Sequence, residues 1–187
     1  MLTVVFYAAK QHFTSGDAPD KESDMGKRKG GRGGKGHLLE QCIKSLKMQG
    51  IQSFSNPEFK RLKTDPPTTY VITQYPHDTL YGTPGRKEGF LRHGADEYII
   101  ETKFQDASGS VSEKLPYVWE AFLASQVKNW VVVFGGRYWK NERAGRAAVA
   151  WLRAQSHNCG IPDGRSFDVV LYPDEFYDLA IERWRKQ

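Results

Sequence analysis

A run of five consecutive apolar residues constrains the fold of this 187-residue chain more than any other feature. The run covers Trp130–Phe134 and ends at the pair Gly135 and Gly136. A strand that is covered on one face alternates apolar and polar residues, whereas a strand covered on both faces is apolar throughout. The run therefore predicts a central strand of a β-sheet that carries helices on both of its faces.

The rest of the chain supplies the further strands and helices that such a sheet needs. Helices are predicted at residues 35–48, 116–125, 144–154 and 174–185, and strands at residues 1–8, 68–73, 87–92, 97–105 and 167–172. The first helix repeats apolar residues at spacings of three and four. A turn at residues 93–96 would join two of the strands into a hairpin. This order indicates an α/β fold, a single domain over residues 1–187 with a central mixed β-sheet flanked by helices on both faces.

Residues 14–36 differ from the rest of the chain, because Gly, Asp, Ser, Lys and Arg dominate there and large apolar residues are almost absent. Such a segment cannot bury enough apolar surface to fold, so we expect a flexible, basic, Gly-rich arm. Its cations among the glycines are Lys27, Arg28, Lys29, Arg32 and Lys35. The chain carries a net charge of +5 with a pI near 9.1, which suits a polyanionic partner whose phosphates these cations could contact.

Several classes of protein are disfavoured by patterns that the chain lacks. The two cysteines, Cys42 and Cys159, form no Cys-x-x-Cys pair, and the histidines form no His-x-x-x-His pair, which argues against zinc sites. No apolar run approaches the roughly 20 residues of a membrane-spanning helix. No basic residue precedes the largely apolar residues 2–7, whereas a secretory signal peptide has a basic region at that place. We therefore expect a cytoplasmic protein with reduced thiols and no membrane partner.

The stretch around residue 101 places an acid, a cation and an amide on one face of a predicted strand. Because alternate side chains share a face, Glu101, Lys103 and Gln105 would project together, with about 7 Å between neighbours. A carboxylate is a ligand for a hard cation such as Mg²⁺, which can activate water and offset phosphate charge. A lysine beside it can orient or deprotonate the attacking water. The pattern indicates hydrolysis of a phosphodiester, although Glu-x-Lys also occurs by chance as an exposed ion pair on many strands.

A metal ion needs at least one more protein oxygen than Glu101 alone provides. Glu88 lies on the partner strand of the predicted hairpin and is the preferred candidate. Asp96 lies in the turn, nearer to Glu101 in sequence but at the far end of the hairpin. Both remain possible from the sequence, with Glu88 favoured.

Three motifs of the chain, at Glu101–Gln105, Gly109–Tyr117 and Gly85–Glu88, resemble those of the PD-(D/E)XK nuclease superfamily. Glu101–Gln105 is similar to the Glu-x-Lys-x-Gln strand of a branch common in phages and prokaryotes, and Gly109–Tyr117 is similar to the Gly-Ser-Val-x-Glu-Lys-x-Pro-Tyr segment that follows it. Gly85–Glu88 resembles the branch's Gly-Arg-x-Glu stretch, with Glu88 at its metal-binding acid. The resemblance covers about residues 35–172. The chain departs from the superfamily pattern at two points. The Pro-Asp pair is absent near Glu88, and Gly89 stands between Glu88 and the aromatic residue Phe90.

The resemblance implies a restriction-endonuclease-like core and assigns roles to residues of its site. Glu88 and Glu101 would bind Mg²⁺, for which Mn²⁺ could substitute, and Lys103 would be the catalytic lysine. Gln105 would steady the attacking water or a phosphate. Glu40, on the first helix, matches a position where such nucleases keep a further metal-site acid, with a solvated helix carboxylate as the alternative.

Three more cations are candidates for contact with nucleic acid. Lys114 starts the helix after the catalytic strand, where it could contact a phosphate or pair with Glu113. Arg137 and Lys140 follow the central strand and could line a DNA groove without reading sequence, or simply face solvent.

The function expected from these residues is that of a Mg²⁺-dependent DNA endonuclease, acting in the host cell cytoplasm if a phage encodes it. A symmetric homodimer is expected because cutting both strands of a duplex needs two active sites. One alternative is a Holliday-junction or branched-DNA resolvase of the same superfamily, and another, ranked lower, is a sequence-specific restriction enzyme. A catalytically silent DNA-binding or assembly factor would have lost an acid or the lysine, whereas Glu88, Glu101 and Lys103 are all present.

Overall fold

The computed structural model describes residues 35–158, 160–161 and 164–184, and all of these belong to one compact unit that spans Gly31–Gln187. The predicted strand at residues 1–8 and the predicted arm up to residue 34 lie outside the described residues. The cations Lys27, Arg28, Lys29 and Arg32 and the side chain of Lys35 lie outside the description as well.

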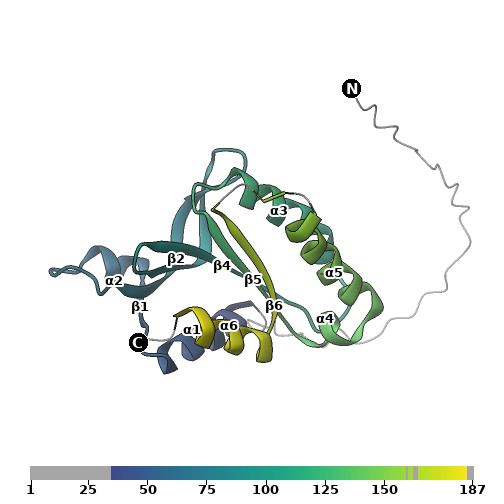
Figure 1. The fold of residues 1–187 in the computed structure, drawn as a ribbon, viewed down its shortest axis with the longest axis horizontal. Coiled ribbons are helices and arrows are strands. Elements are labelled where there is room, and N and C mark those ends of the chain that lie inside the picture. Colours follow the sequence, from purple (N-terminus) through teal and green to yellow (C-terminus); the bar gives the residue numbers. More distant parts are fainter. Residues whose placement is uncertain (1–34, 159, 162–163, 185–187) are drawn as a thin grey trace, which may run out of the picture. The chain divides into compact units, whose positions relative to one another are not determined.

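Six strands form one mixed sheet whose spatial order, β1–β2–β3–β4–β5–β6, follows the chain (Figure 1). Their bounds are β1 Gln52–Ser55, β2 Thr69–Asp78, β3 Pro84–His93, β4 Asp96–Phe104, β5 Asn129–Gly135 and β6 Ser166–Leu171. β2, β3 and β4 form an antiparallel meander, whereas β1 pairs in parallel with β2, β5 with β4, and β6 with β5. The predicted hairpin is confirmed, because His93 of β3 pairs with Asp96 of β4.

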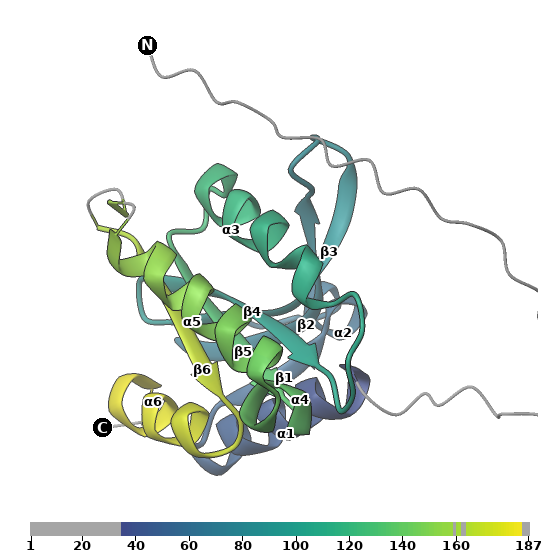
Figure 2. The same ribbon diagram turned by 90° about the vertical axis from the view of Figure 1, so that its right-hand side faces the viewer.

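Helices cover both faces of this sheet. Their bounds are α1 Lys35–Met48, α2 Asn56–Lys60, α3 Leu115–Ala124, α4 Arg137–Asn141, α5 Arg143–Asn158 and α6 Asp174–Trp184, with a 3₁₀ turn, η1, at Ser112–Lys114. Two views agree that α3 and α5 lie on one face, here called the α3/α5 face, while α1 and α6 lie on the other, the α1/α6 face (Figures 1 and 2). The predicted α/β fold with a mixed sheet and helices on both faces is therefore confirmed.

The central apolar strand takes part in two hydrophobic layers. Trp130, Val132 and Phe134 of β5 pack into the layer of the α3/α5 face, whereas Val131 and Val133 pack into the layer of the α1/α6 face. All five side chains are at most 1% exposed. This is the burial on both faces that the unbroken apolar run predicts.

Three short elements, β1, α2 and α4, were not predicted. α2 begins with a capping box, in which Ser55 accepts from the backbone of Glu58 and the Glu58 carboxylate accepts from the backbone N–H of Ser55. None of the helices in the described ranges is long and apolar enough to cross a membrane.

Candidate active site

The strand β4 carries an ion pair on the α3/α5 face of the sheet. Glu101 and Lys103 share a face of the strand with Ile99, which packs into the hydrophobic layer of that face. The ammonium of Lys103 donates to Oε1 of Glu101. The two side chains are only 10% and 16% exposed, for Lys103 and Glu101 respectively. Two charges withdrawn from water in this way are weak evidence for stability, but they are typical of functional sites.

Glu88 reaches this pair through a gap between two strands. The pairing of β3 with β4 ends at Gly89 and Ile100, so that the next residues of β4 have no ladder partner on β3. Oε2 of Glu88 fills the gap, because it accepts from the backbone N–H of Thr102 at 2.9 Å and from the Thr102 hydroxyl. A side-chain carboxylate thereby occupies the place of a backbone carbonyl at the residue after Glu101, near enough for the charge of Glu101 to act on it.

The two carboxylates interact unfavourably. Burial raises the pKa of Glu88 above its ordinary value, and the negative charge of Glu101 raises it further. The hydrogen bonds from Thr102 and the positive charge of Lys103 oppose this shift without cancelling it. Two acids that share a partly buried site favour either a proton or a cation between them.

A backbone distortion lies on β2 opposite Glu88. Gln74 has a φ of 54°, an uncommon conformation for a residue other than glycine. Thr73 still pairs with Gly89 and Tyr75 with Lys87, but the pair between them is missing from the ladder. Strained backbone of this kind is concentrated at functional sites, where it re-aims neighbouring side chains.

Lys87 is a second lysine at the site, and the sequence patterns did not single it out. Its ammonium lies 4.2 Å from the ring centroid of Trp130, which belongs to the layer of the α3/α5 face. Burial lowers the pKa of Lys87, while Glu101 acts in the opposite direction and Lys103 in the same one. In a regular strand Lys87 would face away from Glu88 and from Phe90, so no signal in the sequence places it here.

Gln105 follows the end of β4 and is fixed by the turn after β5. Its backbone N–H donates to Gly135 at 2.9 Å, and its carbonyl accepts from the N–H of Tyr138 at 3.2 Å. Its side-chain Nε2 donates to the carbonyl of Ala107 at 2.6 Å. Oε1 is buried and has no hydrogen-bond partner among the described residues. A buried acceptor without a donor is suited to a water molecule or a cation.

The other two predicted acids, Glu40 and Asp96, lie on different sides of this group. Glu40 is exposed on α1 and lines a groove of about 490 Å³ together with Thr73 and Gln74. Asp96 lies at the opposite end of β4 from Lys103, about 17 Å from Glu101 along the strand. The described residues contain no group of three or more His, Cys, Asp or Glu side chains that could hold a metal ion. The role of Glu40 as a metal ligand stays a prediction.

The predicted DNA-contacting cations of the described region are exposed at helix starts and on α4. Lys114 precedes α3, and no ion pair with Glu113 is found among the contacts of the described residues. Arg137 is exposed, and its backbone N–H donates to Oδ1 of Asp106 at 3.0 Å. Lys140 pairs with Asp174 at 3.7 Å. Their contacts with nucleic acid stay predictions.

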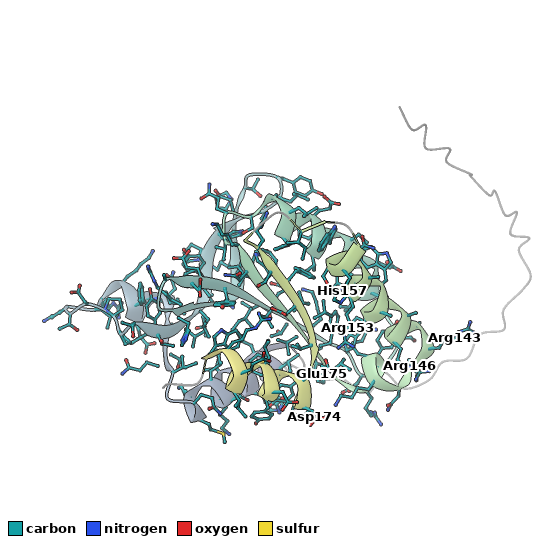
Figure 3. All side chains as sticks on the ribbon, in the orientation of Figure 1. Arg143, Arg146, Arg153, His157, Asp174 and Glu175 are labelled. Carbon is teal, nitrogen blue, oxygen red and sulfur yellow. The ribbon has the colours of Figure 1, made fainter. Side chains whose placement is uncertain are left out.

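Further cations lie along α5, but part of this row serves the fold. Figure 3 shows Arg143, Arg146, Arg153 and His157 along this helix, with Asp174 and Glu175 at the start of α6. Arg153 pairs with Glu175 and donates to the carbonyl of Val169 at 3.1 Å. Arg146 donates to the carbonyl of Asn141 at 2.6 Å. These two side chains therefore have structural partners.

The side chains along this part of the sheet carry atoms that suit a hard divalent cation. They are the carboxylates of Glu88 on β3 and Glu101 on β4, which repel each other, and the unpartnered amide oxygen of Gln105 after the end of β4. All are oxygen atoms, which Mg²⁺ prefers to nitrogen and sulfur. The only cysteine near Glu88 within the described residues is Cys42, and burial raises the pKa of its thiol, so it stays protonated and is a poor ligand.

Comparison with known proteins identifies the family of this fold. The family model described as the PD-(D/E)XK nuclease superfamily domain matches residues 33–176, well over half of the chain. The matched range contains α1, the antiparallel meander, the site on β4 and the central strand β5. Searches of curated proteins and of solved structures found no match. With its mixed sheet flanked by helices as a restriction-endonuclease-like core, the chain belongs to the PD-(D/E)XK nuclease superfamily.

Proposed function

We propose that this nuclease is a metal-dependent DNA endonuclease that uses Mg²⁺, with Mn²⁺ as a substitute. The observation that carries the proposal is the anchoring of Glu88 on Thr102, which adds a second carboxylate to the Glu101–Lys103 pair. Hydrolysis of a phosphodiester by this kind of chemistry needs such a set of acids with an adjacent cation.

Each residue of the site has a distinct role in the proposed reaction. Glu88, Glu101 and the amide oxygen of Gln105 would hold the divalent cation. A bound cation of this kind offsets phosphate charge and lowers the pKa of water. Lys103, fixed on Glu101, would orient the attacking water and stabilise the negative charge on phosphate. Water adds to phosphorus, one P–O bond breaks, and the leaving oxygen takes up a proton.

We further propose that DNA is held through its backbone. Lys114, Arg137 and Lys140 would contact phosphates, and so would the cations of the arm at residues 14–36. Contacts of this kind position a duplex without reading its sequence. A homodimer would present two active sites to the two strands. The presence of both acids and the lysine argues against a catalytically silent binding factor.

The proposal is tested by cleavage assays on supercoiled plasmid, linear duplex, single strand and four-way junction. Each substrate is incubated with the full chain and Mg²⁺, Mn²⁺ or EDTA. Lys103→Ala is compared with Lys128→Ala, a control that removes an exposed lysine from the opposite end of the sheet. We expect cleavage only with metal, its loss in Lys103→Ala and its retention in Lys128→Ala.

The substrate profile separates the neighbouring functions. Preferential cutting of the four-way junction would replace the endonuclease proposal by a junction resolvase of the same superfamily. Salt-dependent DNA binding with no cleavage of any substrate would overturn catalysis in favour of a binding factor. Equal loss of cleavage in both lysine variants would remove the assigned role of Lys103.

A further inference from the structure

A half-buried ammonium without a partner lies at the edge of the proposed active site. Among the described residues, the ammonium of Lys87 makes no hydrogen bond and no ion pair. The ammonium nitrogen lies over the face of the Trp130 ring, 4.2 Å from the ring centroid. A cation–π contact of this kind offsets only part of the free energy lost when an ammonium is withdrawn from water.

The neighbouring carboxylates do not satisfy this ammonium. Glu101 is the strongest attractive charge acting on Lys87, but its Oε1 already accepts from Lys103. Glu88 is taken up by the backbone and hydroxyl of Thr102. Lys87 is therefore close enough to feel both acids, yet neither holds it. It is a cation left over after the acids of the site are assigned.

We propose that Lys87 binds a non-bridging oxygen of the substrate's phosphodiester backbone, next to the phosphate that is cleaved. This inference rests on the proposed function, since it names a substrate contact for the same site. A lysine binds phosphate as a compact point charge with three donors, which suits a single non-bridging oxygen. The Gly-Arg-x-Glu motif does not specify a lysine here, because Lys87 occupies its variable position x.

The surrounding strands hold Lys87 in position before substrate arrives. Lys87 pairs with Tyr75 across β2 and β3, and the ring of Tyr75 stacks on Phe90 with centroids 4.3 Å apart. Beneath the ammonium, the Trp130 ring is 1% exposed and cannot move aside without disturbing the core. A donor that is held in place loses little conformational entropy when it binds.

The experiment compares Lys87→Met and Lys87→Arg in the full chain, with Arg86→Met as the matched control. Methionine keeps an apolar stem over Trp130 and removes the charge, whereas arginine keeps the charge. Arg86 is the exposed neighbour on the same strand, so its substitution changes net charge equally. Steady-state cleavage of a DNA duplex is measured with Mg²⁺, and duplex affinity is measured at several salt concentrations with EDTA in place of metal, so that Lys103 still occupies Glu101.

We expect Lys87→Met to raise KM and weaken binding roughly 10- to 100-fold, as the loss of a charged hydrogen bond does. The salt slope of log affinity should fall by about one, because one phosphate contact is lost. Lys87→Arg should restore most of the slope. Thermal unfolding of each variant identifies any loss of folded protein, to which affinities are normalised.

Three results would overturn the inference. An unchanged salt slope in Lys87→Met would remove the phosphate contact, and so would a change no larger than that of Arg86→Met. A lowered melting temperature with unaltered affinity of the folded protein would assign Lys87 to packing on Trp130. If wild-type protein binds DNA but cuts no substrate, the proposed function fails separately, while the salt slope still decides the role of Lys87.

Discussion

At the scale of single residues, the site gathers charges that the fold alone does not need. Glu88 and Glu101 repel each other, and Lys87 lies half-buried without an ion pair in the described structure. Burying a charged side chain costs free energy unless an opposite charge or a metal ion is bound next to it. A divalent cation and a phosphodiester are the partners that would relieve both conditions.

The substitution Glu88→Gln should abolish the effect of Mg²⁺ on the thermal stability of the protein. The amide keeps the shape and can still accept from Thr102, while the repulsion from Glu101 is removed. We expect the variant to be at least as stable as wild type without metal. We also expect Mg²⁺ to raise the melting temperature of wild type but not of Glu88→Gln, because a ligand stabilises only the state that binds it. Equal Mg²⁺ shifts in both proteins, measured by calorimetry, would remove Glu88 from the metal site.

His77 should make stability depend on pH. Burial and the nearby charge of Lys87 lower the pKa of His77, whose ring stands near Trp130 and which also faces Asp78. The unfolded chain therefore binds a proton at higher pH than the folded protein, so stability falls as the pH drops below about 6.5. Urea unfolding at pH 7.5 and pH 5 should show this loss in wild type and a smaller one in His77→Gln. The exposed His157→Gln serves as control, and an identical loss in both variants would contradict the prediction.

At the scale of elements, the end of β4 depends on a close backbone approach. Gly136 has a φ of 102°, and a Cβ there would lie 2.3 Å from the carbonyl oxygen of Gln105. The turn from β5 into α4 can therefore lie against the end of the catalytic strand only if residue 136 has no side chain. The geometry of Gln105 is thus set by Gly135, the last residue of β5, and by Gly136 in the turn that follows.

Gly136→Ala should be much more destabilising than Gly94→Ala. Gly94, in the β3–β4 turn, also has a positive φ, 60°, but a Cβ there meets nothing within 4 Å. We expect a loss of about 1 kcal/mol for Gly94→Ala from backbone strain, and about 3 kcal/mol or more for Gly136→Ala. Urea denaturation measures both. Similar losses would mean that the approach of residue 136 to Gln105 is not close.

At the scale of the whole described unit, the two hydrophobic layers share one sheet. Residues of β5 enter both layers, so neither layer can lose its packing without exposing one face of the central strand. We therefore expect residues 35–184 to unfold as a single cooperative unit. The site on β4 inherits the rigidity of this sheet, since β5 pairs with it from Tyr98 to Phe104.

A substitution in either hydrophobic layer should lower the stability of the whole unit and leave a single unfolding transition. Phe122→Ala acts on the α3/α5 face and Leu46→Ala on the α1/α6 face, and both side chains are 0% exposed. We expect losses of about 3–5 and about 2–5 kcal/mol respectively, with an unchanged dependence on urea concentration. A biphasic transition or a reduced slope in only one variant would show that the layers unfold independently.

Much of the element order follows from the sequence because it is written in local patterns. The first helix begins and ends where its apolar spacing predicts, at Lys35 and Met48, and Gly50 follows with a φ of 81°. The unbroken run in β5 correctly predicts helices on both faces. The short elements β1 and α4 escaped prediction, because segments of four or five residues are stabilised by their neighbours rather than by their own periodicity.

The sequence by itself determined that Glu101 and Lys103 share one face, because alternation along a strand is a local rule. Only the tertiary structure decided how Glu88 joins them, since the gap left where β3 and β4 separate lets its carboxylate reach Thr102. Only the tertiary structure placed Lys87 over Trp130, since regular alternation along β3 would turn Lys87 away from the layer that holds Phe90 and Trp130. Local chemistry is carried by the chain, whereas convergence of distant side chains depends on how strands separate and bend.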